Sequence, residues 1–398
     1  MKYLLRTLLL SGLMVTLLVH QADGAGFGIF DQGARAFAMA QAFTALADDP
    51  SAIFYNPAGI SQLEGTEVYV GTTIIAPVVE YSADPGSRSS DEEDNIFFPS
   101  YFYVTHRVNN KLTTGFGVFS PFGLVAEWPD DWEGRYISTR SEIKTFFLNP
   151  VISYQITSSI SVAAGFDYVY SDLEMKKKIE FPDGEVKMDG TGSGIGYNLG
   201  LLYHITDTAN FGITYRSAVD IDYDGNADFT LNILDGAITS NIKLPPRLTV
   251  GIATTTIKDW IFTFDIAWTG WSTIDELVVD FEKNAPPTET TPLRWNDVFS
   301  YHFGMEYQLL KSLKLRSGYY FDTTPMPGDT YTPLIPGGNR HGLSVGAGYT
   351  RGNFNTELTY GVLFFEEARK SNDIGGGRAN GAYSTFVNLL GINLSYRF

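Results

Sequence analysis

FVNLLGINLSYRF, residues 386–398, ends the chain and decides how the rest of it is interpreted. Its apolar and polar residues alternate one by one, with Leu390, Ile392, Leu394, Tyr396 and Phe398 on one face of an extended chain. Successive side chains of a β-strand point to opposite faces, so this alternation predicts a strand with one apolar and one polar face.

The same alternation recurs along the chain, in WIFTFDIAW (260–268), FGITYR (211–216) and LKLRSGYYF (313–321). A soluble β-sandwich also alternates, so the pattern by itself leaves two architectures open. Two features favour a membrane barrel: the strands are longer than the ~5–6 residues typical of soluble sheets, and aromatic residues gather at the ends of their apolar faces.

Short and long connections take turns along the chain. We expect short turns at 109–110, 157–159, 206–209, 257–259, 310–311 and 351–352, and long loops at 82–94, 121–136, 224–242, 281–295, 323–339 and 366–382. We expect fourteen strands, at 65–81, 95–108, 111–120, 137–156, 160–180, 187–205, 210–223, 243–256, 260–280, 296–309, 312–322, 340–350, 353–365 and 383–398. The sequence therefore predicts an all-β fold, a 14-stranded antiparallel transmembrane β-barrel.

The first 24 residues predict a secretory signal peptide. Lys2 and Arg6 precede an apolar stretch that ends at Val19, and small residues fit a cleavage site before Ala25. A membrane anchor is the alternative, but the stretch is shorter than the ~20 residues that a spanning helix needs. We expect a mature chain of residues 25–398 in the outer membrane of a Gram-negative bacterium.

Composition argues against several other classes of protein. The chain has no cysteine, which excludes a disulfide framework, a thiolate metal site and a cysteine nucleophile. Its formal net charge of −17 gives no electrostatic reason to bind nucleic acid. The acidic run at 91–94 lacks the ligand spacing and turn glycine of a calcium loop, so we interpret it as a solvated outer loop. We expect no cofactor and no metal.

Residues 25–60 lack the pattern of a spanning strand. They are rich in alanine, a strong helix former with little bulk, and Asp31 is a candidate helix N-cap. Pro50 cannot continue a helix, and Asn56-Pro57 imposes a second turn. A fourteen-stranded barrel is wider than an eight-stranded one, whose lumen side chains can fill. We interpret 25–60 as a small helical hatch inside the lumen and 61–398 as the barrel; a periplasmic extension is the alternative.

The stretch ARAFAMAQAFTALADDPSAIFYNPAGI, residues 34–60, closely resembles the hatch of the FadL-type long-chain fatty acid transporters, also called the toluene/aromatic hydrocarbon transport family. SPFGLVAEWPDDWEGRY (120–136), YRS (215–217), LPPRLTVG (244–251) and the last strand extend the resemblance over the mature chain. The resemblance implies a hatch-plugged barrel that carries hydrophobic molecules across the outer membrane. It also implies a gate formed by the hatch motif, which comprises Asp48, Asp49, Pro50, Asn56, Pro57 and Ala58.

A lateral opening is expected at the top of the third strand. Pro121 removes a backbone donor there, and Gly123 permits unusual backbone angles. In the resembled family a kink in the third strand forms an opening beside the hatch, and Ser120, Pro121, Phe122 and Gly123 match that position. The alternative is that Pro121 simply starts an outer loop.

The residues that would contact the ligand follow from the same loops. Phe119, Phe122, Leu124, Trp128 and Trp132 are candidates for the apolar wall of a capture groove formed by loops 121–136 and 281–295. Each of these side chains fits an interfacial aromatic or apolar belt equally well.

A fatty carboxylate would need a cation. A local match to the family's fifth strand points to Lys177, with Met175 beside the chain, and Arg294 is a second candidate. For Lys177 the alternative is contact with anionic lipopolysaccharide or water.

Other function classes find less support. A barrel enzyme would need a histidine beside a nucleophile, or paired carboxylates, near the outer rim. Only His302 and His341 are expected there, and neither has a Ser/His or Asp/His spacing that we recognise. A polar porin would need a charged constriction instead of a plug, and nothing positive supports an adhesin.

We predict passive uptake of a hydrophobic small molecule by a protein that is not an enzyme. Fatty acid is the first choice of ligand, and aromatic or aliphatic hydrocarbon is the second. The expected partners are outer-membrane lipids, lipopolysaccharide and the barrel assembly machinery, for which Phe398 at the end of an apolar strand face is a recognition signature. We expect a monomer, because a channel closed by its own hatch needs no partner chain.

Overall fold

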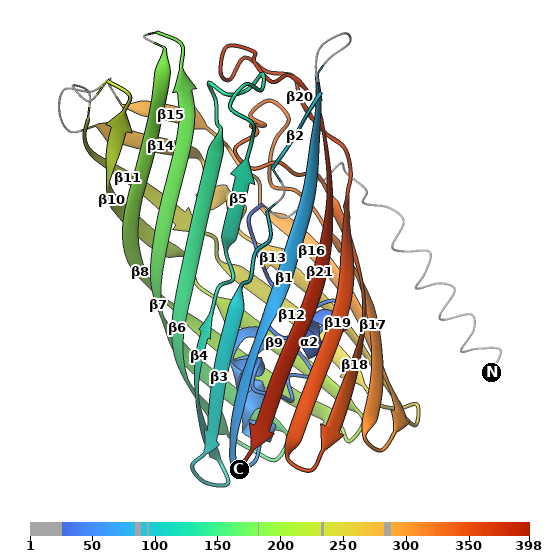
Figure 1. Ribbon diagram of the computed structural model, residues 1–398. Helices are drawn as coiled ribbons and strands as arrows, with labels where there is room; N and C mark the ends of the chain where they lie inside the picture. The colour runs from blue at the N-terminus through green and yellow to red at the C-terminus, as the bar shows by residue number, and fades with distance from the viewer. Residues whose placement is uncertain (1–25, 84–88, 94, 182, 232–234, 282–287) are drawn as a thin grey trace.

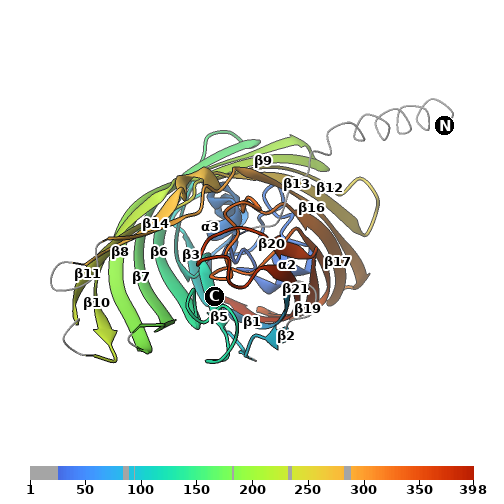
Figure 2. The same cartoon turned by 90° about the horizontal axis from the view of Figure 1, so that it is seen from above.

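The computed structural model describes residues 26–83, 89–93, 95–181, 183–231, 235–281 and 288–398. The predicted signal peptide and its cleavage site lie outside these ranges. The strands form one antiparallel sheet that closes on itself, because β1 (Thr66–Ala83) pairs with β21 (Gly381–Arg397) along its whole length. This closed 14-strand barrel, seen from the side in Figure 1 and along its axis in Figure 2, confirms the predicted fold class.

Some barrel positions are single strands and others are split in two. The single strands are β1, β3 (Ser100–Arg107), β6 (Arg140–Gln155), β7 (Ile160–Ile179), β8 (Gly184–Thr206), β17 (Leu313–Asp322), β18 (Arg340–Arg351), β19 (Phe354–Phe365) and β21. The split positions are β4 (Leu112–Phe119) with β5 (Gly123–Glu127), β9 (Ala209–Arg216) with β10 (Val219–Phe229), β11 (Gly236–Leu244) with β12 (Arg247–Thr254), β13 (Trp260–Thr269) with β14 (Glu276–Phe281), and β15 (Glu289–Pro292) with β16 (Val298–Leu310). Prolines, which cannot donate a backbone hydrogen bond, lie in the breaks β4/β5 and β11/β12.

Two short strands and one short helix lie beside the fourteen barrel positions. β2 (Ser89–Asp91) pairs with β1, and β20 (Ala368–Lys370) pairs with β21. The 3-10 helix η3 (Trp271–Thr273) lies between β13 and β14. The short turns and the C-terminus gather at one rim, and the long loops gather at the other (Figure 1). Each of the fourteen predicted strands overlaps one barrel position. However, β2, β5, β15, β20 and most of β11 lie in segments that were predicted to be long loops.

The two faces of each strand follow the alternation of the sequence. In β13, Thr263, Asp265 and Ala267 are buried in the lumen, whereas Phe264 and Ile266 are exposed on the outside. An outward apolar face suits a strand whose solvent is lipid. The outer face of β10 differs because it is polar: Asp222 and Asp224 point outward and Ile221 points inward. The strand also continues past its predicted end at residue 223.

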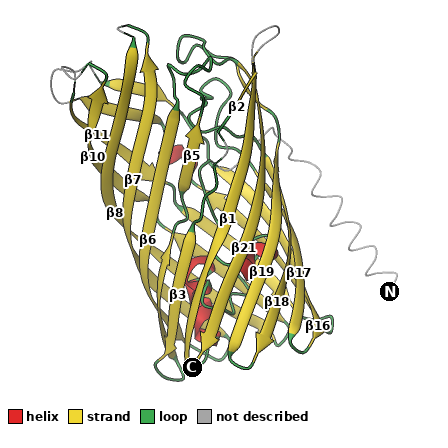
Figure 3. Cartoon of the chain, viewed as in Figure 1, coloured by secondary structure: helices red, strands yellow, loops and turns green. Residues whose placement is uncertain are grey.

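Residues 26–65 lie within the barrel, where α2 (Ala34–Ala38), α3 (Ala52–Tyr55) and η1 (Pro57–Gln62) are the helices seen in Figure 3. Among the helices of the described ranges, none is long and apolar enough to cross a membrane. Strand glycines let this segment approach closely: a Cβ on Gly318 would lie 2.5 Å from the backbone nitrogen of Ala40.

The alanine-rich stretch forms less helix than its composition predicts. The helix N-cap is Gly33, so the predicted N-cap at Asp31 is wrong. Asp31 instead accepts a hydrogen bond from Gln41 Nε2 at 2.9 Å. The helix ends after Ala38 because Ala40 and Gln41 adopt positive φ angles, 52° and 67°, and the chain turns back inside the lumen. η1 continues to Gln62, two residues past the predicted hatch boundary at residue 60.

Candidate ligand passage

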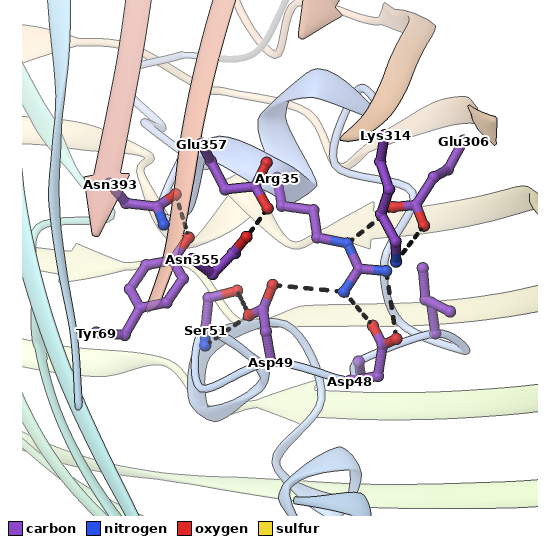
Figure 4. Close-up of polar contacts among 12 residues, drawn as sticks. Arg35, Asp48, Asp49, Ser51, Tyr69, Glu306, Lys314, Asn355, Glu357 and Asn393 are labelled. Carbon is purple, nitrogen blue, oxygen red and sulfur yellow. Dashed lines mark hydrogen bonds and ion pairs between the residues drawn. The ribbon is translucent and has the colours of Figure 1, made fainter. Parts of the chain in front are cut away.

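An ionic network ties the N-terminal segment to the barrel wall (Figure 4), near the short turn between β16 and β17. Arg35 of α2 donates from Nε to Glu306 of β16 at 3.0 Å and from Nη1 to Asp48 at 2.8 Å. Arg316 of β17 donates to the same Glu306 oxygen at 2.7 Å and also binds Glu357 of β19. All of these side chains except Asp48 are nearly inaccessible to solvent. The segment is therefore bound to the barrel wall by ion pairs that are mostly shielded from solvent.

The carboxylates around Arg35 keep its guanidinium charged at the centre of this network. Burial alone would lower the pKa of Arg35, but the carboxylates of Asp48 and Glu306 raise it well above its usual range. Burial raises the pKa of Asp49 to about 6, against the lowering effects of Arg35 and of the hydroxyl of Ser51, which donates to Asp49 at 2.5 Å. The predicted Asp48 and Asp49 therefore belong to an anchor of the segment.

The Asn-Pro turn is a second anchor. Asn56 donates from Nδ2 to the carbonyl oxygens of Thr44 at 2.8 Å and Leu201 at 3.0 Å, and its Oδ1 accepts from the Ala58 amide. Pro57 begins η1, and Pro50 precedes α3. The side chain of Asn56 thus joins two loops of the segment to strand β8 of the wall.

At the opposite side the segment touches the kink between β4 and β5. The Ile29 amide donates to the Pro121 carbonyl at 2.8 Å, and the Gly123 amide donates to the Phe27 carbonyl at 3.0 Å, so that Gly28 and Phe122 are bridge partners. Gln32 adds a bond from Nε2 to the Ser120 carbonyl at 2.8 Å. The segment replaces the strand neighbour that the kink has lost.

The barrel wall is interrupted beside this kink. β3 and β4 pair only as far as Phe102 and Val118, and the strand ladders of the described residues join β5 to β6 alone. The two sides meet again at Glu127, whose amide donates to Glu92 Oε1 at 2.9 Å. We call the interval the window; residues 97–100, which stay bonded to β1, form one side, and residues 120–126 form the other.

A cavity of about 500 Å³ passes through the window. Ile29, Ile143 and Leu389 line it from the lumen, while Phe98 and Phe146, which are exposed on the outside of the barrel, line its other end. This window cavity therefore connects the lumen with the surface that faces lipid. Its lining is mainly apolar, which suits a hydrophobic molecule better than an ion.

A smaller outer cavity of about 120 Å³ lies toward the long loops. Its apolar lining comes from several strands and loops: Leu124, Leu173, Met175, Ile242, Leu277, Leu293 and Leu334. Phe27, Leu124, Ile143 and Ile335 line both this cavity and the window cavity. One apolar surface therefore leads from the loops to the window.

A third cavity, the inner chamber, lies on the other side of Phe122 and measures about 50 Å³. Phe122 lines both the chamber and the window cavity. The chamber walls are partly polar and include Tyr55, Arg216, Arg247 and His302. The predicted location of His302 at an outer strand end is wrong, because its imidazole is buried against the Ala40 carbonyl, 2.8 Å from Nδ1.

The structure brings together only part of the predicted site. Ser120, Phe122, Gly123 and Leu124 line the window cavity, and Met175 lines the outer cavity. Pro121 lines the inner chamber. Phe119 lies among rings below the window, with its centroid 5.8 Å from that of Phe147, and lines none of the three cavities.

The remaining predicted ligand contacts have other partners. Trp128 and Trp132 are buried and stack on each other with centroids 4.4 Å apart. Lys177 forms an ion pair with Glu289, and Arg294 is exposed and binds Asp329 at 2.8 Å. None of the four lines any of the three cavities. No group of three or more potential metal-binding side chains occurs among the residues that the structure describes.

The sequence interpretation did not single out several residues of the passage. Phe27 is the third residue after the predicted cleavage site, and the centroid of its ring lies 4.9 Å from that of Trp271. Ile143, Leu173 and Ile242 are inward-facing residues of three different strands, so strand alternation could have placed each on the lumen side. Their meeting in one cavity depends on strand stagger, which alternation does not give.

The comparisons with known proteins agree with this architecture. The family model described as "Outer membrane protein transport protein (OMPP1/FadL/TodX)" matches residues 15–398. A long-chain fatty acid transport protein of Salmonella typhi is 26% identical over 396 residues, which cover 87% of this chain and 88% of that protein.

Two solved structures are similar in fold. A FadL homologue of Pseudomonas aeruginosa superposes with a TM-score of 0.84 at 18% identity, covering 94% of this chain and 100% of that one. The toluene transporter TbuX of Ralstonia pickettii gives a TM-score of 0.72 at 19% identity, covering 93% and 100%. These two likenesses concern the fold alone.

Proposed function

Since this chain belongs to the OMPP1/FadL/TodX family of outer membrane transport proteins, we propose that it takes up long-chain fatty acids and releases them sideways through the window. The family establishes the coarser function: this is a transport protein of the Gram-negative outer membrane for hydrophobic substrates, and it is not an enzyme. The choice of fatty acid, the gate and the lateral route are our proposal.

The observation that carries the proposal is the cavity that crosses the wall at the kink. A molecule in the outer cavity touches Leu124 and Ile143, and the same two side chains lead into the window cavity. In the other direction, the lumen is filled by residues 27–63, most of which are buried. A hydrophobic molecule that follows the apolar surface would therefore leave into the outer membrane without crossing the packed segment.

The energetics favour a long alkyl chain. Burying each CH₂ group contributes about 0.8 kcal/mol, so a long chain gains several times more than a single small ring does. The window cavity has room for a large part of such a chain. The name of the Salmonella relative points to the same class of substrate.

An aromatic hydrocarbon is the second candidate. The window cavity is rich in rings, with Phe27, Phe97, Phe122 and Phe146 among its lining residues. Such a lining suits an aromatic solute through ring packing. A hydrocarbon would need no charged contact, and this difference separates the two candidates experimentally.

Uptake of radiolabelled oleate and toluene by cells that lack their own transporter, with and without this chain, tests the proposal. In the variant Ser120→Trp a large side chain would fill the window, and we expect uptake to fall at least about tenfold. Leu315→Trp, on the outside of β17, is the matched control that should transport normally. Toluene uptake alone would move the ligand to hydrocarbons, and unchanged oleate uptake by Ser120→Trp would contradict the lateral route.

A further inference from the structure

We propose that the inner chamber binds the carboxylate of a fatty acid, with Arg247 as the principal charged contact, while the alkyl chain occupies the window cavity. This inference rests on the proposed function and specifies where the head group is held. It replaces Lys177 and Arg294, whose charges are already matched by Glu289 and Asp329.

The first observation is a pair of like charges in register. Arg216 of β9 and Arg247 of β12 are direct partners in the antiparallel ladder. Like charges directly opposite each other on one sheet face are destabilising. Asp167 neutralises Arg216 by an ion pair, but no carboxylate of the described chain lies within 4.0 Å of the Arg247 guanidinium. Arg247 therefore has no ion-pair partner within this distance among the described residues, and Asp322 and Asp265 act on its charge only from farther away.

The second observation is the set of unused donors. Among described residues, Arg247 donates only from Nη1, to the hydroxyl of Thr269 at 3.0 Å. The Nη2 of Arg216 is buried without a hydrogen-bond partner. A guanidinium carries five N–H donors in a planar fork that matches a carboxylate. The two side chains therefore present unfilled donors to one small chamber, and a carboxylate would satisfy them.

The nearby acids bind other groups of the chain, although Asp265 Oδ1 is buried without a hydrogen-bond partner among the described residues. Asp265 accepts the backbone amides of Phe43 at 3.0 Å and Thr44 at 2.9 Å, and so holds the N-terminal segment. Asp322 binds Arg340 at 2.9 Å. These bonds leave Arg247 to stack its guanidinium on the ring of Phe30, 3.9 Å from the centroid. The ring fixes the guanidinium at the chamber wall without neutralising it.

The size of the chamber selects a head group. Its volume of about 50 Å³ exceeds the roughly 10–15 Å³ that one water molecule needs on the same measure, so a carboxylate has room there, and it is far below the 500 Å³ of the window cavity. Phe122 separates the chamber from the much larger window cavity. A fatty acid bound across Phe122 would place its charge on Arg247 and its chain among apolar side chains.

The test compares two ligands that differ only in the head group. Binding of radiolabelled oleate and oleyl alcohol is measured on the purified full-length protein in lipid nanodiscs, for wild type, Arg247→Gln, Arg247→Lys and Lys177→Gln. We expect Arg247→Gln to weaken oleate binding at least about tenfold, because hydrogen bonds to a charged group are lost. Oleyl alcohol binding should change less than about twofold. Arg247→Lys should keep part of the preference for oleate, and Lys177→Gln should keep all of it.

The outcomes are distinguishable. Failure of wild type to bind either ligand would overturn the proposed function itself. An Arg247→Gln protein that keeps its preference for oleate, or a Lys177→Gln protein that loses it, would overturn the head-group site alone. Equal loss of both ligands in Arg247→Gln and in Arg247→Lys would show that Arg247 only positions Phe30, and would also overturn it.

Discussion

The N-terminal segment is held in two different ways at its two ends. Toward the short turns, Arg35 meets Asp48 and Glu306 inside a buried ionic network. At the kink, two backbone hydrogen bonds and the side chain of Gln32 are the polar contacts between residues 27–32 and residues 120–123. The buried ion pairs of the first set cost more free energy to break than the hydrogen bonds of the second set. From this difference we propose that residues 26–30 act as the gate of the N-terminal segment and that residues 34–62 act as its fixed base.

Arg35→Met should have the largest effect, because it removes a charge from the buried network. Breaking a buried ion pair from one side costs about 3–5 kcal/mol, since the partner charge stays behind in a dry site. We expect a lower free energy of unfolding in urea titrations, faster chymotrypsin cleavage within residues 26–63, and higher conductance to small ions in planar bilayers.

Lys258→Met is the control for Arg35→Met, because Lys258 is exposed in the turn before β13. It should leave stability and conductance unchanged. An Arg35→Met protein with wild-type stability and a closed lumen would show that the base is not anchored by this network.

Gln32→Ala should have an effect of intermediate size, and it should raise the uptake of oleate. It removes hydrogen bonds of 2.8 Å to the carbonyls of Ile29 and Ser120, for a loss of about 1–2 kcal/mol. Weaker contact at the gate would populate the open state more, so we expect oleate uptake to rise a few-fold at low oleate concentration.

Gln62→Ala sharpens the comparison as a matched variant in the base. Gln62 also makes two side-chain bonds, to the carbonyls of Leu46 at 3.0 Å and Ala47 at 3.1 Å. It should lose a similar amount of stability without any rise in uptake. Equal uptake by the two variants would remove the distinction between gate and base.

The smallest effect concerns Glu92, in the connection between β2 and β3 at the edge of the window cavity. Burial raises its pKa from 4.5 to about 8, partly offset by the Glu127 amide that donates to it. The folded state therefore holds a proton that the unfolded chain releases, so this group's contribution to stability is full below pH 4.5 and is lost as the pH rises to about 8. Above pH 8 a negative charge appears beside the window.

Oleate uptake should accordingly fall about twofold between pH 7 and pH 9, since the new charge repels the carboxylate. Glu92→Gln should flatten this decline, whereas Glu93→Gln, at an exposed neighbour, should keep it. A decline that is the same in all three proteins would assign the pH dependence to the ligand or the lipid.

The sequence was sufficient for the barrel and for the position of the kink. Strand alternation and turn lengths can be recognised from neighbouring residues alone. Pro121 has no backbone N–H, so the sequence itself indicates that a ladder hydrogen bond is missing there. The window needs more than the kink, however, because residues 97–100 must also stay with β1, as the bridge between Ile75 and Phe97 shows. No local pattern in residues 97–100 indicates that they pair with β1, more than 20 residues earlier in the chain.

The ligand contacts could be predicted only in part, for a related reason. Trp128 and Trp132 are aromatic residues in an outer loop, and the sequence pattern cannot tell that their buried rings stack on each other. Lys177 is neutralised by Glu289 from a distant strand. Arg247 also lies in a strand, but it forms no ion pair with any residue that the structure describes. Whether a charge is matched depends on tertiary neighbours, so the sequence could offer candidates but could not choose among them.

A disulfide between gate and kink tests the central claim most directly, because the chain has no cysteine of its own. Gly28 and Phe122 are bridge partners without hydrogen bonds between them, a pairing with Cα atoms about 4.5 Å apart that accepts a disulfide. The control pair lies in the base: a Cβ on Gly391 would lie 3.4 Å from that of Ala34.

We expect oxidised Gly28→Cys/Phe122→Cys cells to take up no oleate above background and to recover uptake when dithiothreitol reduces the bond. Oxidised Ala34→Cys/Gly391→Cys cells should take up oleate at the same rate as after reduction. Uptake by the oxidised Gly28→Cys/Phe122→Cys protein at its reduced rate would contradict the account, because the passage would then open without movement of residues 26–30.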